Sequence, residues 1–592
     1  MITNMKKVTL LCMESDRDTA LAQLQDMGVL HLEPIASPEG SDVESAKQRL
    51  HDAQHALDLL KAAHEKGEVQ VSGDNHDAEL AVTRISDLAQ KRQHLEEERV
   101  SLDHEMRRLE PYGDFEPDQI SSLADHGISV RLFHETDRHP VTAPEDASRF
   151  LLSENGPDRY VAVIGEDLAE CGGTELPLPE KSLSRVRESR DMVEGRLAEI
   201  EDEINSKLAP QSRSIEKHID LLEDDAQYVT ARAGMGQAPG IAYLQGYCAE
   251  DVAGEVEAAA GQNGWGVVID DPSATDEVPT LVRHPAWIKP IKAVLDVIKI
   301  TPGYKEQDIS LVFLIFFSIF FAMLIGDAGY GLIFLALTLF ARVKMKKAPA
   351  YPFSMLTFLS ICTVIWGTIT GNYFGVTAEK APLSGFQFPW LAEDNNIMAL
   401  CFTIGAIHMT IAHIWRFIML LPSRKCLEQV GWICVLWSMF FHARNLVAQM
   451  AAPSFTNILL GVGIALIALF MCTSKEELKK EGINLAMLPL SIVSALVDVI
   501  SYIRLFAVGM ASLSVAESFN DMAAGIGMSN LFTMFGAALI LFLGHALNIV
   551  LCGLAVLVHG VRLNTLEFSM HMGMEWSGTP FSPFKRLAKT QT

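Results

Sequence analysis

The sequence predicts a mostly α-helical chain: a cytoplasmic antiparallel coiled coil with two small α/β lobes, followed by an eight-helix transmembrane domain. Three observations lead to this fold class. Apolar residues repeat at spacings of three and four along two polar stretches of the first half. Long apolar blocks fill the chain from about residue 307 onward. Residues 1–300 contain 30 Lys and Arg against 58 Asp and Glu, whereas residues 301–592 contain 18 against 15.

The composition argues against several classes of function. An acidic first half disfavours nucleic-acid binding, which requires basic surface. The nine cysteines are scattered without a CxxC pair, which predicts reduced thiols and no structural metal. The sequence has no GxxxxGK(S/T) phosphate loop, so we expect neither a cofactor nor ATP hydrolysis by this chain alone. The first residues are polar, and we expect no signal peptide.

A proximal lobe is expected from residues 1–40 and 236–285 of a cytoplasmic domain that covers 1–300. A strand, a helix and a strand are predicted over 7–13, 16–27 and 29–34, and the same order recurs over 240–248, 250–263 and 266–270. Each of these units is too small to bury a core alone. They either pack together as one lobe or remain two unrelated pieces.

Two coiled-coil arms are predicted over 41–110 and 179–235. The first arm has a break near Gly67–Gly73, and the second has a kink at Pro210. The arms enclose a distal α/β lobe over 111–178, with strands predicted at 128–133 and 160–164. Arms separated by such an insert should fold back as an antiparallel pair, and the alternative is a solvated helical spacer without a partner.

The transmembrane domain, residues 301–592, contains eight apolar segments. They cover 309–326, 329–345, 353–372, 397–421, 427–447, 456–473, 484–520 and 528–566. Most meet the roughly 20-residue requirement of a bilayer. The last two exceed it, so they should be tilted or project from the membrane. Between the first two segments, Asp327 is expected to cap a helix within a tight glycine-rich reversal.

Basic residues set the predicted orientation. They follow segments two, four, six and eight, whereas the loop 372–396 is acidic. The basic residues are Arg342, Lys344, Lys346, Lys347, Arg424, Lys425, Lys475, Lys479, Lys480, Lys585, Arg586 and Lys589. The positive-inside rule therefore places both termini and the whole first half in the cytoplasm.

The seventh segment contains a single arginine in an apolar run. Arg504 lies within residues 487–519, where a guanidinium costs on the order of 2.5–3.5 kcal/mol on insertion scales. Arginine stays charged there, because its pKa is above about 12. Asp498 is six residues away and cannot form a simple i,i+4 pair with Arg504. We therefore expect the partner of Arg504 on another helix or another chain.

A polar stripe follows one face of the eighth segment. Its members are spaced by three and four residues: His545, Asn548, Cys552, Ala555, His559 and Arg562. Inside a membrane such a face is wet or contacts protein, and the alternative is that its polar groups only join helices. Glu517 is either a channel carboxylate or a solvated helix end. A straight hairpin of the last two segments would place Arg504 level with His545, not with Arg562, so the helices must tilt or be staggered if both arginines face the same side.

Together these segments resemble the a/I subunit of the V/A-type rotary ATPases. The matching motifs are Gly326-Asp327-Ala328-Gly329-Tyr330-Gly331, Gly371-Asn372-Tyr373-Phe374-Gly375, Ser501-Tyr502-Ile503-Arg504-Leu505, Gly544-His545-Ala546-Leu547-Asn548, and His559-Gly560-Val561-Arg562-Leu563 with Glu567-Phe568. The two arginine motifs, in this order on the last two segments, form a specific combination. The C-terminal run Ser569–Trp576 departs from the aromatic-rich pattern that is frequent in the family.

The resemblance implies a stator beside a rotating proteolipid c/K ring whose subunits carry membrane carboxylates. It implies two ion half-channels, with Arg504 as the essential arginine and Arg562 as a second arginine near it. Polar channel or support positions are implied for His559, Glu567, His545 and Asn548. Asp498 and Glu517 are further candidates, because they are carboxylates on the arginine helix.

The resemblance also implies partners and a location. These are peripheral-stalk E/G-type subunits on the cytoplasmic lobes, a central-stalk C/d-type subunit, and the lipid bilayer of a bacterial or archaeal cell. Nucleic acid is not expected as a partner. The sequence decides neither between protons and sodium ions nor between ATP synthesis and hydrolysis.

Two other functions fit part of the same sequence. A secondary transporter also places polar groups in a helix bundle, but it predicts inverted repeats with broken helices, and the sequence shows no such repeat. If the chain were a coiled-coil membrane anchor or sensor, the buried arginines would have no function.

Overall fold

The structure is a computed structural model that describes residues 1–587 apart from 65–77, 137–138, 145, 167, 169–170, 172–173, 347, 377–385, 472–485 and 528–529. The predicted break near Gly67–Gly73 lies outside the described residues, as do the basic residues Lys347, Lys475, Lys479, Lys480 and Lys589. The chain divides into two units, which are described separately. Unit 1 comprises Met1–Lys7, Tyr247–Gly254 and Ile269–Ser582, and unit 2 comprises Val8–Gly246, Glu255–Val268 and Pro583–Thr592.

A five-stranded sheet contains both predicted strand–helix–strand repeats. Its order is β2 (His31–Glu33), β8 (Ile241–Ala249), β1 (Met5–Met13) and β9 (Gly266–Asp270), and β7 (Gly236–Ala238) pairs with β8. Along β1 the side chains of Val8, Leu10 and Cys12 are buried, which is the period-2 pattern of a strand with one face on a core. The helices of the two repeats are α1 (Arg17–Met27) and α7 (Ala253–Asn263).

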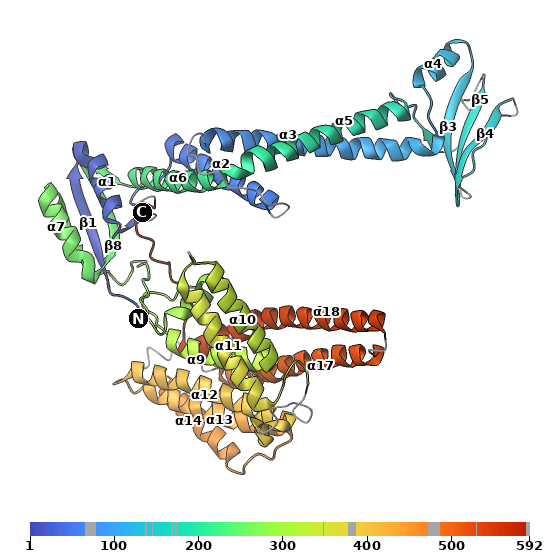
Figure 1. The fold of residues 1–592 in the computed structure, drawn as a ribbon. Helices are drawn as coiled ribbons and strands as arrows, with labels where there is room; N and C mark the ends of the chain where they lie inside the picture. The colour runs from blue at the N-terminus through green and yellow to red at the C-terminus, as the bar shows by residue number, and fades with distance from the viewer. Residues whose placement is uncertain are drawn as a thin grey trace. The chain divides into compact units, whose positions relative to one another are not determined.

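The arms of unit 2 consist of two antiparallel helix pairs, in which α2 packs on α6 and α3 packs on α5 (Figure 1). The helices are α2 (Ser41–His64), α3 (Ala78–Leu109), α5 (Leu183–Asp202) and α6 (Ser212–Ala233). Their apolar stripes meet in one cluster that includes Leu60, Ile85, Leu88, Ile204, Ile215 and Ile219. At the predicted kink, the chain passes through the π-helical turn η3 (Glu203–Leu208) and the 3-10 turn η4 (Ala209–Gln211), which contains Pro210.

A second sheet forms the far end of the arms. Its order is β4 (Ser148–Asn155), β5 (Asp158–Gly165), β3 (Ser129–Thr136) and β6 (Thr174–Leu176), and α4 (Pro117–Asp125) precedes it. The sequence predicts β3 and β5, whose central residues Phe133, Val161 and Val163 are buried. It does not predict β4, because β4 is an edge strand that is exposed along almost its whole length and shows no alternation.

The apolar half of the chain folds into a helical bundle in unit 1. Its longer helices are α9 (Ser310–Ile325), α10 (Ala328–Lys344), α11 (Ala350–Thr370), α12 (Asp394–Leu420), α13 (Cys426–Ala448), α14 (Thr456–Phe470), α16 (Leu488–Ser501), α17 (Ile503–Ile526) and α18 (Leu531–Ala555). Among the described residues, five helices are long and apolar enough to cross a membrane, and six if one bent pair is counted. That pair is α9 and α10, which bend by 119° at Gly326–Asp327. The expected count of eight spans is thus not confirmed, because these two helices and α14 are short.

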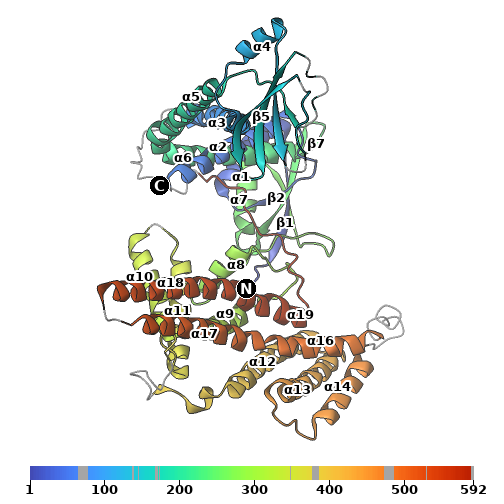
Figure 2. The ribbon, with the colours of Figure 1, turned by 90° about the vertical axis from the view of Figure 1, so that its right-hand side faces the viewer.

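The two C-terminal helices are the longest in the bundle and lie side by side (Figure 2). One comprises α16 and α17 and runs from Leu488 to Ile526, and the other runs from Leu531 to Met572. The second passes from α18 through the π-helical segments η10 (Val556–Gly560) and η11 (Leu563–Phe568) into α19 (Ser569–Met572). Only 22% of the most apolar window of each helix is buried within the chain. An extended apolar surface is therefore left for lipid or another protein.

The last two helices do not form the straight hairpin that would place Arg504 level with His545. The sequence placed the hairpin turn near residues 520–528, but α17 continues to Ile526 and α18 begins only at Leu531. The later turn shifts the register, so that Phe519 packs against Gly544 and Ser512 contacts Asn548. Arg504 consequently lies beside the π-helical segments and not beside His545.

Candidate functional site: a charged cluster between the last two helices

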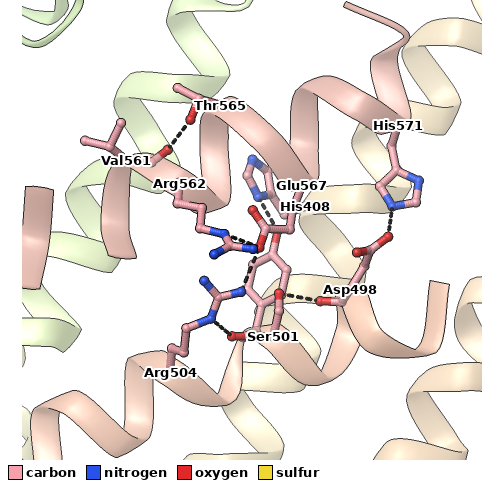
Figure 3. Close-up of polar contacts among 10 residues, drawn as sticks. His408, Asp498, Ser501, Arg504, Val561, Arg562, Thr565, Glu567 and His571 are labelled. Carbon is pink, nitrogen blue, oxygen red and sulfur yellow. Dashed lines mark hydrogen bonds and ion pairs between the residues drawn. The ribbon is translucent and has the colours of Figure 1, made fainter. Parts of the chain in front are cut away.

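Arg504 forms an ion pair with a buried carboxylate on the neighbouring helix (Figure 3). It lies in the first turn of α17, immediately after an irregular turn at Tyr502 that separates α16 from α17. Its Nη2 donates a hydrogen bond to Glu567 Oε1 at 2.8 Å, and its Nε donates to the Ser501 carbonyl at 3.0 Å. The Arg504 side chain is 23% exposed and that of Glu567 is 6% exposed.

A second arginine faces the same carboxylate oxygen. Arg562 Nε lies 3.6 Å from Glu567 Oε1, and its side chain is 54% exposed. The other oxygen, Oε2, is buried and has no hydrogen-bond partner among the residues that the structure describes. We call Arg504, Arg562 and Glu567 the arginine cluster. It carries a formal charge of +1, so one guanidinium charge remains uncompensated within the cluster.

The π-helical segments explain how Arg562 and Glu567 meet. A regular α-helix would place residues five apart at about 140° around its axis. Between Val556 and Phe568 the chain is largely π-helical, and the wider turn of a π-helix, with its i→i+5 hydrogen bonds, brings residues i and i+5 nearer to one face. A pattern of three- and four-residue spacings therefore could not predict that these two side chains face one oxygen.

A second polar group links four helices next to the arginine cluster. Asp498 Oδ2 lies 3.2 Å from His571 Nε2, His571 Nδ1 lies 3.1 Å from His413 Nε2, and His413 Nδ1 lies 2.9 Å from Gln429 Oε1. We call Asp498, His571, His413 and Gln429 the histidine chain. It connects α16, α19, α12 and α13, and Figure 3 shows its Asp498–His571 end.

Tyr502 and His408 fill the space behind the arginine cluster. The two side chains share a hydrogen bond of 2.8 Å between the Tyr502 hydroxyl and His408 Nδ1. Both are buried, and the His408 ring stacks between Phe316 and Phe568. His408 is therefore an interior histidine, although its Nε2 has no hydrogen-bond partner among the described residues.

A third polar group lies farther along the hairpin, toward its turn. His545 Nδ1 is 2.8 Å from the Tyr330 hydroxyl, and His545 Nε2 is 3.1 Å from Asn520 Oδ1. The Asn548 amide donates to the Tyr330 hydroxyl and to the Ser512 carbonyl. The structure thus brings the predicted residues His545 and Asn548 together, but they lie about four turns or more from Arg562 along the same helix.

Asp327 is a structural residue, as the sequence predicts. Its carboxylate accepts hydrogen bonds from the backbone N–H groups of Gly329 and Tyr330 at the start of α10. It also accepts from the N–H groups of Phe374 and Gly375 in the loop after α11. One carboxylate therefore joins the bend between α9 and α10 to a second loop.

The remaining predicted residues lie apart from these contacts. His559 is half-buried, within electrostatic range of both Arg504 and Arg562. Glu517 is half-buried on α17 and has no ion-pair partner among the described residues. Sequence reasoning missed the roles of His571, Gln429 and Tyr502. A signal existed for His571, since it lies four residues after Glu567 and so near the same helix face.

The described residues include no group of three or more His, Cys, Asp or Glu side chains arranged to hold a metal ion. What the site offers is fixed positive charge next to an apolar surface, with hydrogen-bonded imidazoles nearby. Such a site can stabilise an anionic group that approaches from outside the chain, and it can hold or move protons.

Curated relatives match the chain over its whole length. It is 28% identical to "V-type ATP synthase subunit I" of Borreliella burgdorferi over 624 residues, covering 100% of both chains. It is 28% identical to "V-type ATP synthase subunit I 1" of Treponema pallidum, covering 99% of this chain and 100% of the relative. "A-type ATP synthase subunit I" of Methanocaldococcus jannaschii is 27% identical, covering 71% of this chain and 65% of the relative.

No family model matches the chain. Among solved structures, a crystal structure of the cytoplasmic N-terminal domain of subunit I, homolog of subunit a, of V-ATPase aligns with 45% of this chain and 99% of its own length. The sequence identity is 16% and the TM-score is 0.20. At that score the match carries no argument about the fold.

Proposed function

We propose that this chain, a homologue of the subunit I chains of V-type and A-type ATP synthases, is the membrane stator that conducts ions against a rotating proteolipid ring. The ion flow would be coupled to ATP synthesis or hydrolysis by other subunits of the complex. The observation that carries the proposal is the arginine cluster, which holds a net positive charge on a helix pair whose apolar surface the chain itself leaves uncovered.

The cluster supplies what an ion-releasing site requires. A carboxylate carried through lipid is favoured in its protonated or ion-bound form, because an isolated charge there is costly. Opposite a guanidinium the ionised form is favoured instead. A ring carboxylate that reaches Arg504 therefore releases its ion. The same fixed positive charge repels a cation that would otherwise pass directly between the two half-channels, so leak is suppressed.

Glu567 supports this role without neutralising it. The ion pair with Glu567 and the bond to the Ser501 carbonyl fix the direction of the Arg504 side chain. These bonds use Nε and Nη2, and Nη1 has no hydrogen bond among the described residues. Two arginines share a single carboxylate, so one positive charge is available to an incoming ring carboxylate. Lysine would be a poor substitute, because burial can remove its proton.

The two other polar groups are proposed as parts of the half-channels. The group around Tyr330, His545 and Asn548, with Glu517 nearby on α17, would line the path on the outer side. The histidine chain would lie on the cytoplasmic side, if the basic loops face the cytoplasm. The E/G-type and C/d-type stalk subunits are proposed as partners of the cytoplasmic lobes.

The test removes the arginine from the assembled complex. In vesicles that contain the purified complex, Arg504→Ala and Arg504→Lys should each abolish ATP-driven ion uptake while the complex still assembles. Arg342→Ala, which changes an exposed arginine at the end of α10, is the control and should leave uptake unchanged. Coupled uptake at the wild-type rate in Arg504→Ala would refute the proposal. So would purification of the chain from its membranes without any proteolipid.

A further inference from the structure

We propose that residues 285–299, which we call the juxtamembrane segment, form a binding site for the headgroups of anionic phospholipids. Trp287 and Val297 enter the lipid surface. Three lysines pair with the lipid phosphates, namely Lys289, Lys292 and Lys299. The inference does not rest on the proposed stator function, because it requires only that apolar helices of unit 1 cross a membrane.

The juxtamembrane segment is fixed at the level where a membrane helix begins. It contains the 3-10 turn η6 (Lys289–Ile291) and the short helix α8 (Lys292–Ile298), and both pack on α11. The hydroxyl of Tyr351, the second residue of α11, donates a hydrogen bond to Asp296 Oδ2 at 3.2 Å. Because α11 is long and apolar enough to cross a membrane, its first turn lies near the bilayer surface. The segment that is bonded to this turn lies there as well.

One side of the juxtamembrane segment is packed into the core of the helical bundle. Ile288 and Ile291 are buried and belong to the same apolar cluster as Phe313 and Phe317 of α9. Further side chains of the segment pack against this cluster, namely Ala293, Val294, Leu295 and Ile298. With one side held in this way, the side chains of the other side remain at the surface in a fixed direction.

Two large apolar side chains of the juxtamembrane segment are left largely uncovered by the described part of the chain. Trp287 is 63% exposed and Val297 is 68% exposed. Tryptophan is favoured at the headgroup level of a membrane, where its ring contacts apolar groups and its N–H stays near water. In aqueous solvent, both side chains would instead leave apolar surface in contact with water. A lipid surface therefore fits both of them.

The charge of the juxtamembrane segment is opposite to that of the half of the chain in which it lies. Residues 1–300 are acidic overall, whereas 285–299 contain three lysines and one aspartate. The three lysines are exposed, and their ammonium groups have no ion pair or hydrogen bond among the residues that the structure describes. Lysine can lay its apolar stem along a membrane surface and keep its ammonium group at the headgroups. Anionic lipid phosphates supply the charge that these ammonium groups lack.

A membrane surface fits this combination better than a protein partner. Lysine is depleted in protein–protein interfaces, whereas segments that lie on membranes combine lysine with tryptophan and aliphatic side chains. The helix on which the segment packs also exposes large apolar side chains farther along its length, at Leu356, Phe358 and Ile361 of α11. Lipid chains that cover these residues place their headgroups near the first turn of α11, where the lysines lie.

The experiment measures which lipid surrounds Trp287 in the full-length chain reconstituted into vesicles. Brominated phospholipids quench tryptophan fluorescence on contact, and the difference between the wild type and Trp287→Phe isolates the contribution of Trp287. Titration of brominated phosphatidylglycerol against phosphatidylcholine gives a relative binding constant at this position. We expect phosphatidylglycerol to be preferred by about 5-fold or more, which is the effect of one lysine near an anionic surface.

The chain offers a matched tryptophan in acidic surroundings. Trp390 is 45% exposed in the 3-10 turn η9 (Pro389–Ala392), close in sequence to the exposed residues Glu393 and Asp394. The fluorescence difference between the wild type and Trp390→Phe should therefore show no preference for phosphatidylglycerol.

Lysine variants test the source of the preference. Substituting all three lysines of the juxtamembrane segment with glutamine should bring the relative binding constant at Trp287 close to that of phosphatidylcholine. Lys305→Gln is the control for the loss of a nearby lysine, because the Lys305 ammonium group already donates to the Ala274 carbonyl at 2.8 Å. This control should keep the wild-type preference.

Three results would overturn the inference. The first is an equal affinity of both lipids at Trp287 in the wild type, and the second is a preference that survives the loss of all three lysines. The third is the absence of quenching by either lipid together with carbodiimide crosslinks from these lysines to carboxylates of another protein, which would identify a protein as the occupant. None of these results bears on Arg504, so the stator proposal is tested separately.

Discussion

At the scale of single residues, the arginine cluster shows how a membrane protein can keep a buried charge. Removing one partner of a buried ion pair is costly because the other is left uncompensated. Here Glu567 is almost wholly buried and receives hydrogen bonds or close contact from two guanidiniums at one oxygen. Arg504 is less buried than its partner, so it remains able to meet a second anion at the helix surface.

Glu567→Gln tests this division of roles. The substitution keeps the volume of the side chain but removes the only carboxylate of the cluster, so the two guanidiniums repel each other. We expect a loss of about 3 kcal/mol of stability, as for a broken buried pair, seen as a lower thermal midpoint of the purified chain in detergent. Glu575→Gln is the control, because Glu575 is exposed and lies after α19. An unchanged thermal midpoint in Glu567→Gln would show that the ion pair contributes nothing to the stability of the chain.

At the scale of helices, the sequence predicted what depends on regular periodicity. The apolar stripes of the arms, the long C-terminal helices and the cap at Asp327 follow from spacings of three and four and from turn chemistry. The convergence of Arg562 and Glu567 could not be predicted, because it depends on a local change to π-helical geometry. The level of Arg504 relative to Arg562 could not be predicted for a related reason: a shift of a few residues in the turn moves every contact along a hairpin.

The packing of α17 on α18 gives a second test. A Cβ at Gly544 would lie 2.2 Å from the Phe519 ring, so Gly544→Ala should separate the helices and cost about 1–3 kcal/mol. Gly536 on the same helix has open space around its Cβ position, and Gly536→Ala should be neutral or stabilise the helix by up to about 1 kcal/mol. Thermal unfolding of the two variants in detergent makes the comparison. Equal midpoints would mean that the close approach at Gly544 is not needed.

At the scale of the whole molecule, the chain has two parts. One is acidic and contains the small sheets and the coiled-coil arms, and the other is apolar and helical. The apolar part leaves large side chains exposed along α18, including Phe532, Phe535, Phe542, Val550 and Leu554. In the proposed complex, the ring covers the part of this surface near the arginine cluster and lipid covers the rest. The sequence could not distinguish these two neighbours, since both are apolar.

Photocrosslinking distinguishes them. A benzophenone side chain placed at Val550, exposed on α18, should crosslink to the short proteolipid in the intact complex. The same side chain at Ile365, exposed on α11, should give no protein crosslink to the ring, because the proposed ring surface lies on the helices that carry Arg504 and Arg562. Product masses in denaturing gels provide the readout. Crosslinking to the proteolipid from Ile365 and not from Val550 would contradict the proposed contact between the ring and α18.

In the proposed complex, the hydrogen bonds of Asp327 would have a mechanical consequence, because the proposed stator stays still while the ring turns. The loop that Asp327 holds also touches α17, since a Cβ at Gly375 would come within 2.5 Å of the Ala516 Cβ. A sideways push on α17 is therefore passed to this loop, and from there through one side chain to the start of α10. In that complex the torque would be shared among several short helices and would not fall on one long helix alone.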